Sequence, residues 1–399
     1  TGGANGTAVG VFERIGAATI SKTSTVGISP SNVGGATLLT AAGATEQGST
    51  ALNAGQLQNA ASARLNGLLG ASCQAPSAQH WLLGGDTSTG RETLLLLSNP
   101  GTVPATVNLE VYAEGGRVQA SGLSGIAVSA GETQVVPLSS LIPETRAFAV
   151  QVQSRGASVG AWLQQRTVRG LLYAGADFVS PLTEIGKSLS IPGILVRGAK
   201  DAAALIAIND DYADLIPALR VFNPNDKPAT FTAQIFGAND KTFGTVIRES
   251  VPANSVKDFT ITGLADGDYA AFVSGDQNLA AAVRLPRSDK TKKPNTDFTW
   301  LQAAQLLTGS HQITVPATGI SKLSLTNSGN QSTTVTINGV AVAIKAQGTV
   351  VVKADAGALS IKTEGKVGGN LVVDIGGAIT NLGLVDYRNS GSRVAVRVR

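Results

Sequence analysis

The sequence predicts an all-β protein built from three tandem immunoglobulin-like β-sandwich domains. Two observations predict it: a composition that suits strands and turns, and a segment that recurs three times. Charged residues form 15% of the 399 residues, below the roughly 25% that is usual in soluble domains. The 47 glycines favour strands joined by turns over helices. The length suits roughly two to four domains.

The recurring segment is an apolar run that ends in Asn99, Asn223 or Asn327. A threonine stands seven positions after each Asn, and a strand former follows it. Neighbouring copies are 124 and 104 positions apart, about the length of an immunoglobulin-like sandwich. We interpret each copy as a β-hairpin whose first strand ends at the Asn and whose partner strand begins at the threonine.

Alternation after the threonine predicts one buried face for each partner strand. The residues of that face are Val107, Leu109 and Val111 in the first copy, Phe231, Ala233 and Ile235 in the second, and Val335 and Ile337 in the third.

Domain boundaries follow from the spacing of the copies. Residues 1–185 form an N-terminal extension, which adds strands to the first sandwich, and that sandwich itself. Residues 186–308 form the second sandwich, with an insertion near 199–218, and residues 309–399 form a third, shorter one.

One short helix is expected near residues 51–69, where Leu57, Ala61, Leu65 and Leu68 recur at helical spacing. Residues 393–399 alternate strictly. They predict a last strand, which is either an ordinary outer strand of the third domain or an edge that pairs with another chain.

Charge and apolar patterning exclude several classes of protein. The net charge is +4 and the basic residues are scattered, so we expect no nucleic-acid partner. No run approaches the ~20 apolar residues of a membrane helix. The chain starts at Thr1, so we expect membrane contact only through a removed anchor. Cys73 is the only cysteine, which leaves an exported location open.

Groups suited to catalysis are few. His80 and His311 both precede the opening strand of a copy, which indicates repeat architecture. Asp177 and Asp297 both precede a phenylalanine, which we interpret as turn-capping or strand-end duty. No catalytic residue and no cofactor are expected.

Two ligand hypotheses remain open. Asp210, Asp211 and Asp214 supply carboxylates of the kind that bind Ca²⁺, although they lack the residue order of a calcium loop, and a solvated acidic insertion is the simpler interpretation. The three tryptophans, Trp81, Trp162 and Trp300, are candidates for stacking on sugar rings, with core packing as the alternative.

Five motifs, at residues 71–76, 79–85, 90–91, 97–100 and 104–107, resemble an uncharacterised family of actinobacterial envelope proteins. The resemblance covers most of the chain and implies an exported, often membrane-tethered protein. We expect this chain to depart from the family in its missing tether and its shortened third copy, which leaves its anchoring open. The resemblance transfers no catalytic residue.

The sequence therefore predicts a non-enzymatic structural or interaction protein of the cell envelope, outside the cytoplasmic membrane. Its expected partners are other envelope proteins or a second copy, bound through edge strands or loops. The alternative is a non-catalytic accessory or glycan-binding subunit of an envelope polysaccharide machine.

Overall fold

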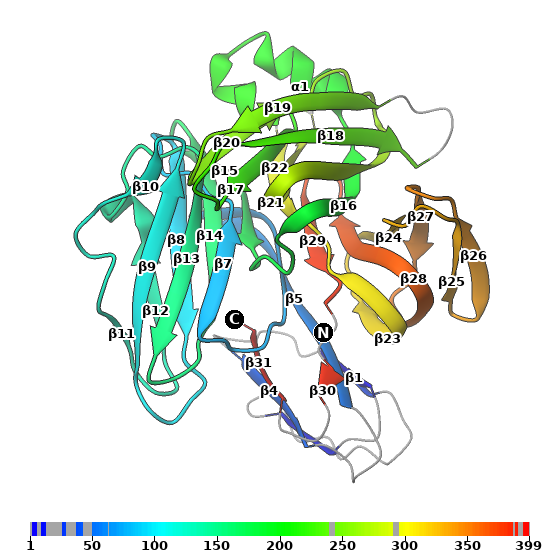
Figure 1. Ribbon diagram of the computed structural model, residues 1–399, viewed down its shortest axis with the longest axis horizontal. Helices are drawn as coiled ribbons and strands as arrows, with labels where there is room; N and C mark the ends of the chain where they lie inside the picture. The colour runs from blue at the N-terminus through cyan, green and yellow to red at the C-terminus, as the bar shows by residue number, and fades with distance from the viewer. Residues whose placement is uncertain are drawn as a thin grey trace.

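The computed structural model describes ten stretches of the chain, and side chains within four of them. The stretches are residues 2–5, 9–12, 26–28, 37–42, 50–62, 64–238, 244–289, 295–385, 388–389 and 394–398. Side chains are described in 54–62, 64–238, 244–289 and 295–385. Strands hold 64% of the chain and helices 5%, which confirms the all-β prediction (Figure 1).

A first set of nine strands forms two sheets that enclose a core. In one sheet β7 and β9 flank β13, and β10 and β11 pair with β9; in the other β8 and β15 flank β14, and β12 pairs with β8. The strands are β7 (Gln79–Leu83), β8 (Arg91–Ser98), β9 (Ala105–Ala113), β10 (Gly116–Val118), β11 (Ile126–Val128), β12 (Thr133–Pro137), β13 (Phe148–Arg155), β14 (Gly160–Arg169) and β15 (Leu172–Val179), and the 3₁₀ helix η1 (Leu138–Ser140) follows β12.

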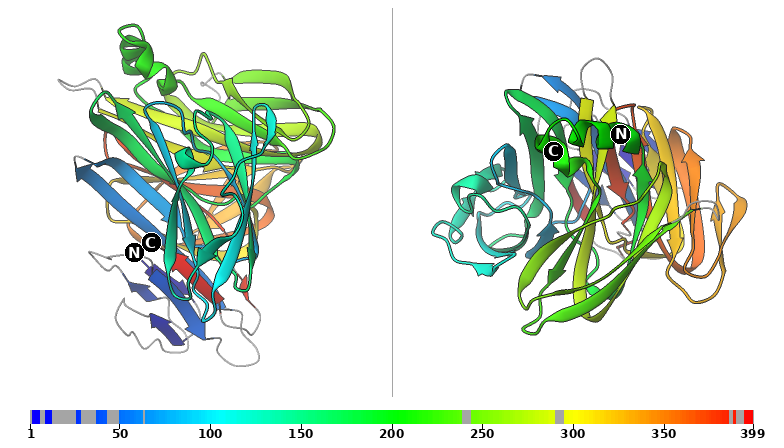
Figure 2. Two further views of the ribbon diagram at one scale, coloured as in Figure 1. Left: turned by 90° about the vertical axis from the view of Figure 1, so that its left-hand side faces the viewer. Right: turned by 90° about the horizontal axis from the view of Figure 1, so that it is seen from above.

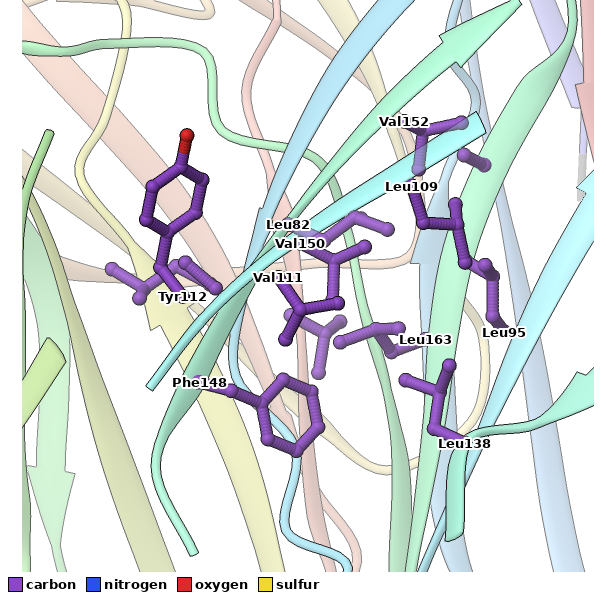
Figure 3. Close-up of a cluster of buried hydrophobic side chains, with 14 of the residues drawn as sticks. Leu82, Leu95, Leu109, Val111, Tyr112, Leu138, Phe148, Val150, Val152 and Leu163 are labelled. Carbon is purple, nitrogen blue, oxygen red and sulfur yellow. The ribbon is translucent and has the colours of Figure 1, made fainter. Parts of the chain in front are cut away.

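Alternating side chains of the two sheets fill this core, as predicted for the first copy. Val107, Leu109 and Val111 of β9 are at most 4% exposed. Figure 3 shows Leu109 and Val111 gathered with Leu95 of β8 and Leu163 of β14, which belong to the opposite sheet.

A second set of strands repeats this pairing. One long strand, β21, takes the positions that β13 and β14 occupy in the first set. Its first half pairs with β16 and β18, and its second half pairs with β17 and β22. β19 pairs with β18, and β20 with β17. The elements are β16 (Gly186–Val196), α1 (Ala199–Ile206), the 3₁₀ helix η2 (Asp210–Leu215), β17 (Ala218–Asn223), β18 (Ala229–Gly237), β19 (Thr245–Val251), β20 (Ser255–Thr260), β21 (Gly267–Asp289) and β22 (Asn295–Gln302).

A third set has the same connections. β28 pairs with β23, β24, β25 and β29, while β26 pairs with β25 and β27 with β24. The strands are β23 (Leu306–Val315), β24 (Ile320–Asn327), β25 (Thr333–Ile337), β26 (Val340–Ile344), β27 (Thr349–Ala354), β28 (Gly357–Asp374) and β29 (Ile379–Gly383). The first and third sets lie on opposite sides of the second (Figure 2).

The hairpin predicted at each recurring Asn is wrong. In no set do the two strands that flank the Asn pair with each other, so the loop joins two strands that pair with different neighbours. The Asn side chain holds this loop. Asn223 is fully buried, and its Nδ2 donates to the carbonyl oxygens of Lys227 at 2.8 Å and Val251 at 3.1 Å. Its Oδ1 accepts from the Asn225 nitrogen at 3.0 Å.

The same contacts recur in the other two sets. Nδ2 of Asn99 donates to the carbonyls of Val103 and Val128, and Nδ2 of Asn327 donates to those of Gln331 and Ile344. A buried carbonyl that loses its donor is costly, so one residue type stands at all three positions.

The helix predicted near residues 51–69 is also wrong, because a hairpin of two strands, β5 (Thr50–Ser62) and β6 (Leu65–Ser72), occupies this range. The Ser62 hydroxyl accepts from the backbone nitrogens of Arg64 and Leu65 at the turn. Leu68 and Leu69 are fully buried against other strands, and such packing overrides local helical spacing.

The terminal strands pair with each other and do not complete the first set. β1 (Gly2–Asn5) pairs with β3 (Val26–Ile28) and β5, and β5 pairs with β30 (Arg388–Asn389). β4 (Thr37–Ala42) lies between β2 (Val9–Phe12) and β31 (Val394–Val398). These strands lie together at one end of the molecule (Figure 1). The predicted last strand therefore exists as β31, but its placement in the third domain is wrong, because β31 pairs with β4 and not with a strand of the third set.

Candidate functional site

A buried polar junction lies where the last strand of each set meets the β5–β6 hairpin. We call the strands β6, β15, β22 and β29 the central junction. β6 and β22 each contact both β15 and β29, although the four strands belong to separate ladders. A Cβ atom on Gly67, which has a φ of 145°, would lie 2.6 Å from the Ala176 nitrogen. Glycine is required there for the two backbones to approach.

Asp177 of β15 joins all four strands of the junction. The residue is 0% exposed. Its Oδ1 accepts from the Gly70 nitrogen at 2.8 Å and from the Thr380 hydroxyl at 2.9 Å, and its Oδ2 accepts from the Thr299 hydroxyl at 2.5 Å.

Asp297 of β22 does the same from the neighbouring strand. It is 2% exposed. Its Oδ2 accepts from the backbone nitrogens of Leu68 at 2.9 Å and Ile379 at 3.0 Å, and its Oδ1 accepts from that of Ala176 at 3.1 Å. A carboxylate whose two oxygens face several donors acts as a cross-link between backbones.

Both carboxyl groups have raised pKa values. Burial raises the pKa of Asp297 from 3.8 to about 7, against the lowering effect of its backbone donors. Burial likewise raises the pKa of Asp177 well above its ordinary value, and the negative charge of Asp297 adds to this. The cause is the lost hydration of the charged form. Both residues lie within strands, so the turn-capping interpretation was wrong.

The predicted calcium ligands do not come together. Asp210 and Asp211 are exposed, whereas Asp214 faces the guanidinium groups of Arg91 at 2.8 Å, Arg169 at 2.5 Å and Arg284 at 3.1 Å. Burial alone would raise the pKa of Asp214, but the three arginines outweigh burial and lower it.

These contacts attach the inserted segment to its neighbours. Arg91 belongs to β8, Arg169 to β14 and Arg284 to β21, so Asp214 anchors η2 across the first and second sets. Across the part of the chain whose side chains are described, no group of three His, Cys, Asp or Glu residues is placed to hold a metal ion.

Two of the three tryptophans are buried, and the third is half-buried. Trp162 is 4% exposed and Trp300 2%. Trp300 donates from Nε1 to Gln165 Oε1 at 2.7 Å, and the Arg220 guanidinium lies 4.5 Å from its ring centroid. The half-buried Trp81 ring packs against Tyr112 and Phe222. Trp162 and Trp300 therefore offer no open ring face to a sugar.

The two histidines contact backbone carbonyls. Nε2 of His80 lies 2.7 Å from the Val159 oxygen, and Nε2 of His311 lies 2.9 Å from the Thr308 oxygen. Burial lowers the pKa of His80, so its neutral form prevails at neutral pH.

Two surface features were not predicted from the sequence. A polar groove of about 470 Å³ crosses β18, β19 and β21, and its lining consists of Thr230, Phe231, Thr232, Arg248, Glu249, Ser250, Ser274 and Asp276. The second feature is the β14–β15 hairpin tip, where Leu171 is 95% exposed and Leu172 73%. Polar residues normally occupy such turns, and two adjacent leucines in the sequence were the available signal.

The fold and the junction define an all-β protein whose three strand sets share one pairing pattern and meet at buried carboxylates. The chain belongs to the family of unknown function DUF5719, whose model matches residues 28–361. No curated protein and no solved structure matches the chain. Among the helices of the described residues, none is long and apolar enough to cross a membrane.

Proposed function

We propose that this protein is a non-enzymatic structural or interaction protein of the actinobacterial cell envelope, held outside the cytoplasmic membrane. Its three immunoglobulin-like sandwiches are the strand sets β7–β15, β16–β22 and β23–β29, which correspond to the domains predicted at residues 1–185, 186–308 and 309–399 without the terminal strands. The protein binds other envelope proteins or itself. The repeated pairing pattern and the low charge content support a rigid β-scaffold that presents loops and edges.

The observation that carries the proposal is the β14–β15 hairpin tip. Arg169 pairs with Leu172 across a two-residue turn at Gly170 and Leu171. The turn is short, so the two leucines extend into solvent on a stiff support. Exposed apolar side chains on a rigid tip are favourable anchors for an apolar pocket on a partner, since little further ordering is needed on binding.

Site-specific photo-crosslinking in intact cells tests this proposal. A photoreactive residue at position 171 should capture one protein reproducibly, and Leu171→Asp with Leu172→Asp should abolish the binding of that protein to the purified chain. Val103→Asp is the matched control, because Val103 is 51% exposed on a loop of the first set and should not matter. Binding that survives the double substitution would contradict the role of the tip.

The location has its own test. A membrane-impermeant label applied to intact cells should modify the protein as fully as it modifies a known surface protein. Labelling that requires lysis would place the protein inside the cell and remove the envelope part of the proposal.

The second candidate function, a glycan-binding subunit of a polysaccharide machine, is favoured by the groove over β18, β19 and β21. Its hydroxyl and charged side chains match the hydrogen-bonding needs of a polysaccharide. Binding on a glycan array that is lost in Thr232→Val and kept in Thr106→Val, at an exposed threonine of β9, would favour this function over the first.

A further inference from the structure

In the third strand set, the edge strand β26 lacks the features that usually prevent an edge from pairing with another strand. Its sequence, Val-Ala-Val-Ala-Ile, contains no charge, Val340 is 66% exposed, and β26 pairs with β25 alone among the described strands. It lies at the outer side of the molecule (Figure 1). An exposed apolar edge offers free backbone donors and acceptors to another strand.

The corresponding edges of the other two sets are protected. In the first set this edge is broken into β10 and β11, of three residues each. In the second set β19 carries Arg248 and Glu249 at its centre. Short strands and central charges are the common means of preventing edge pairing, and β26 has neither.

The turn before β26 fixes which backbone groups point outward. Asn338 and Gly339 both have positive φ, 47° and 84°, as in a type I′ two-residue turn. The residues beside such a turn, Ile337 and Val340, form a hydrogen-bonded pair, and hydrogen-bonded pairs then alternate along the ladder. Val340, Val342 and Ile344 therefore bond toward β25, while Ala341 and Ala343 direct their N–H and C=O groups outward.

We propose that β26 pairs antiparallel with β26 of a second copy of this chain, about a twofold axis through Val342. Ala341 of each copy then forms a hydrogen-bonded pair with Ala343 of the other, and the two Val342 residues face each other. The pairing rests on the interaction role proposed above and names one of its surfaces and partners.

Charge and self-complementarity favour a second copy as the occupant. The nearest cation along the strand is Lys345. In the antiparallel pairing Lys345 lies opposite Gly339, and the two Lys345 residues are six positions apart, roughly 20 Å, beyond the Debye length. A parallel pairing would place them side by side. A five-residue strand pair falls below the ~1,000 Å² of a stable interface, so the dimer is reversible.

Sedimentation equilibrium of the full chain, from micromolar to millimolar concentration, tests the pairing. The wild type should pass from monomer to dimer, and Val342→Lys should weaken the dimer about tenfold or more, because like charges would meet across the axis. Val342→Lys mixed with Val342→Glu should restore dimers, which separates pairing from misfolding. Val246→Lys on β19, at a residue that is 47% exposed, is the matched control and should change nothing.

Disulfide trapping tests the register. Two Val342→Cys residues would lie about 4.5 Å apart at a non-hydrogen-bonded pair, within the range a disulfide spans, and should cross-link on oxidation. Ala343→Cys should not cross-link, since the Cα atoms of the two substituted residues would lie about 8 to 9 Å apart. Cys73 is buried and does not compete.

A wild-type chain that stays monomeric, equal effects of the β19 and β26 variants, or equal cross-linking at both positions would each overturn the pairing. So would binding of an extended peptide by a chain that does not dimerise. None of these results alters the capture of a partner through Leu171, so failure of the pairing is distinguishable from failure of the proposed function.

Discussion

The central junction makes the stability of this protein depend on pH through Asp297. The ordinary pKa of an aspartate, 3.8, applies to Asp297 in the unfolded chain, and burial raises it to about 7 in the folded chain. The folded chain therefore binds the proton more tightly than the unfolded chain. Stabilisation from this proton is fully present below pH 3.8 and is lost as pH rises through 7. The contribution of Asp297 to the free energy of unfolding should therefore increase as pH is lowered from about 8 to about 4. Below about pH 6.5 the lowered pKa of His80 acts in the opposite direction, equally in the wild type and in a variant at Asp297.

The magnitude follows from the shift. About three pKa units at ~1.4 kcal/mol each give about 4 kcal/mol. Asp297→Asn removes this titration. In acid the variant should be less stable than the wild type by about 1–3 kcal/mol, because its amide N–H₂ faces the backbone N–H groups of Ala176, Leu68 or Ile379. At about pH 8 the wild type carries the cost of a buried charge, so the difference should vanish or reverse.

Urea unfolding at a series of pH values measures this difference. A shallower dependence should remain in the variant, because Asp177 still titrates with a raised pKa. Stabilisation from the lowered pKa of Asp214 is present above pH 3.8 and is lost below it, outside this window. Asp355→Asn, at a side chain that is 90% exposed, is the control and should follow the wild type. Parallel curves for Asp297→Asn and the wild type would refute the reasoning.

Three further outcomes follow from the contacts described above. Asn223→Ala leaves the buried carbonyls of its loop without donors and should lower the free energy of unfolding by about 2–4 kcal/mol; a loss no larger than that of an exposed substitution such as Asn278→Ala would contradict this. Asp214→Ala leaves three arginines facing one another and should cost about 3–5 kcal/mol by thermal unfolding, whereas Asp210→Ala and added Ca²⁺ or EDTA should change little. Burial raises the pKa of the Cys73 thiol, so a thiol reagent should react with it only as fast as the chain unfolds; rapid labelling of the folded protein would show that Cys73 is accessible.

The repeat in the sequence identifies the three equivalent Asn residues because each one donates hydrogen bonds to the carbonyls of the loop that follows it. Their loops could not be distinguished from hairpins, since a loop of six residues, such as the one between Asn99 and Thr106, fits either connection. Only the pairing of β8 and β9 with different neighbours, set by distant strands, decides between them.

The junction and the arginine cluster were beyond local reasoning for a related reason. Asp214 gave a carboxylate in an acidic segment, but its partners come from positions 91, 169 and 284. The spacing within residues 51–69 likewise predicts a helix where the structure has the β5–β6 hairpin. Packing of β6 against β15 and β29 selects the strands, and local spacing does not reveal that packing.

The contacts of Asp177 also govern the order in which the chain can fold. Its donors stand 107, 122 and 203 positions away along the sequence, so large loops must close before the carboxylate is satisfied. During synthesis the hydrogen bonds of Asp177 cannot all form until Thr380 has left the ribosome. Folding should accordingly be slow, and the three strand sets should melt in a single cooperative transition, not one after another.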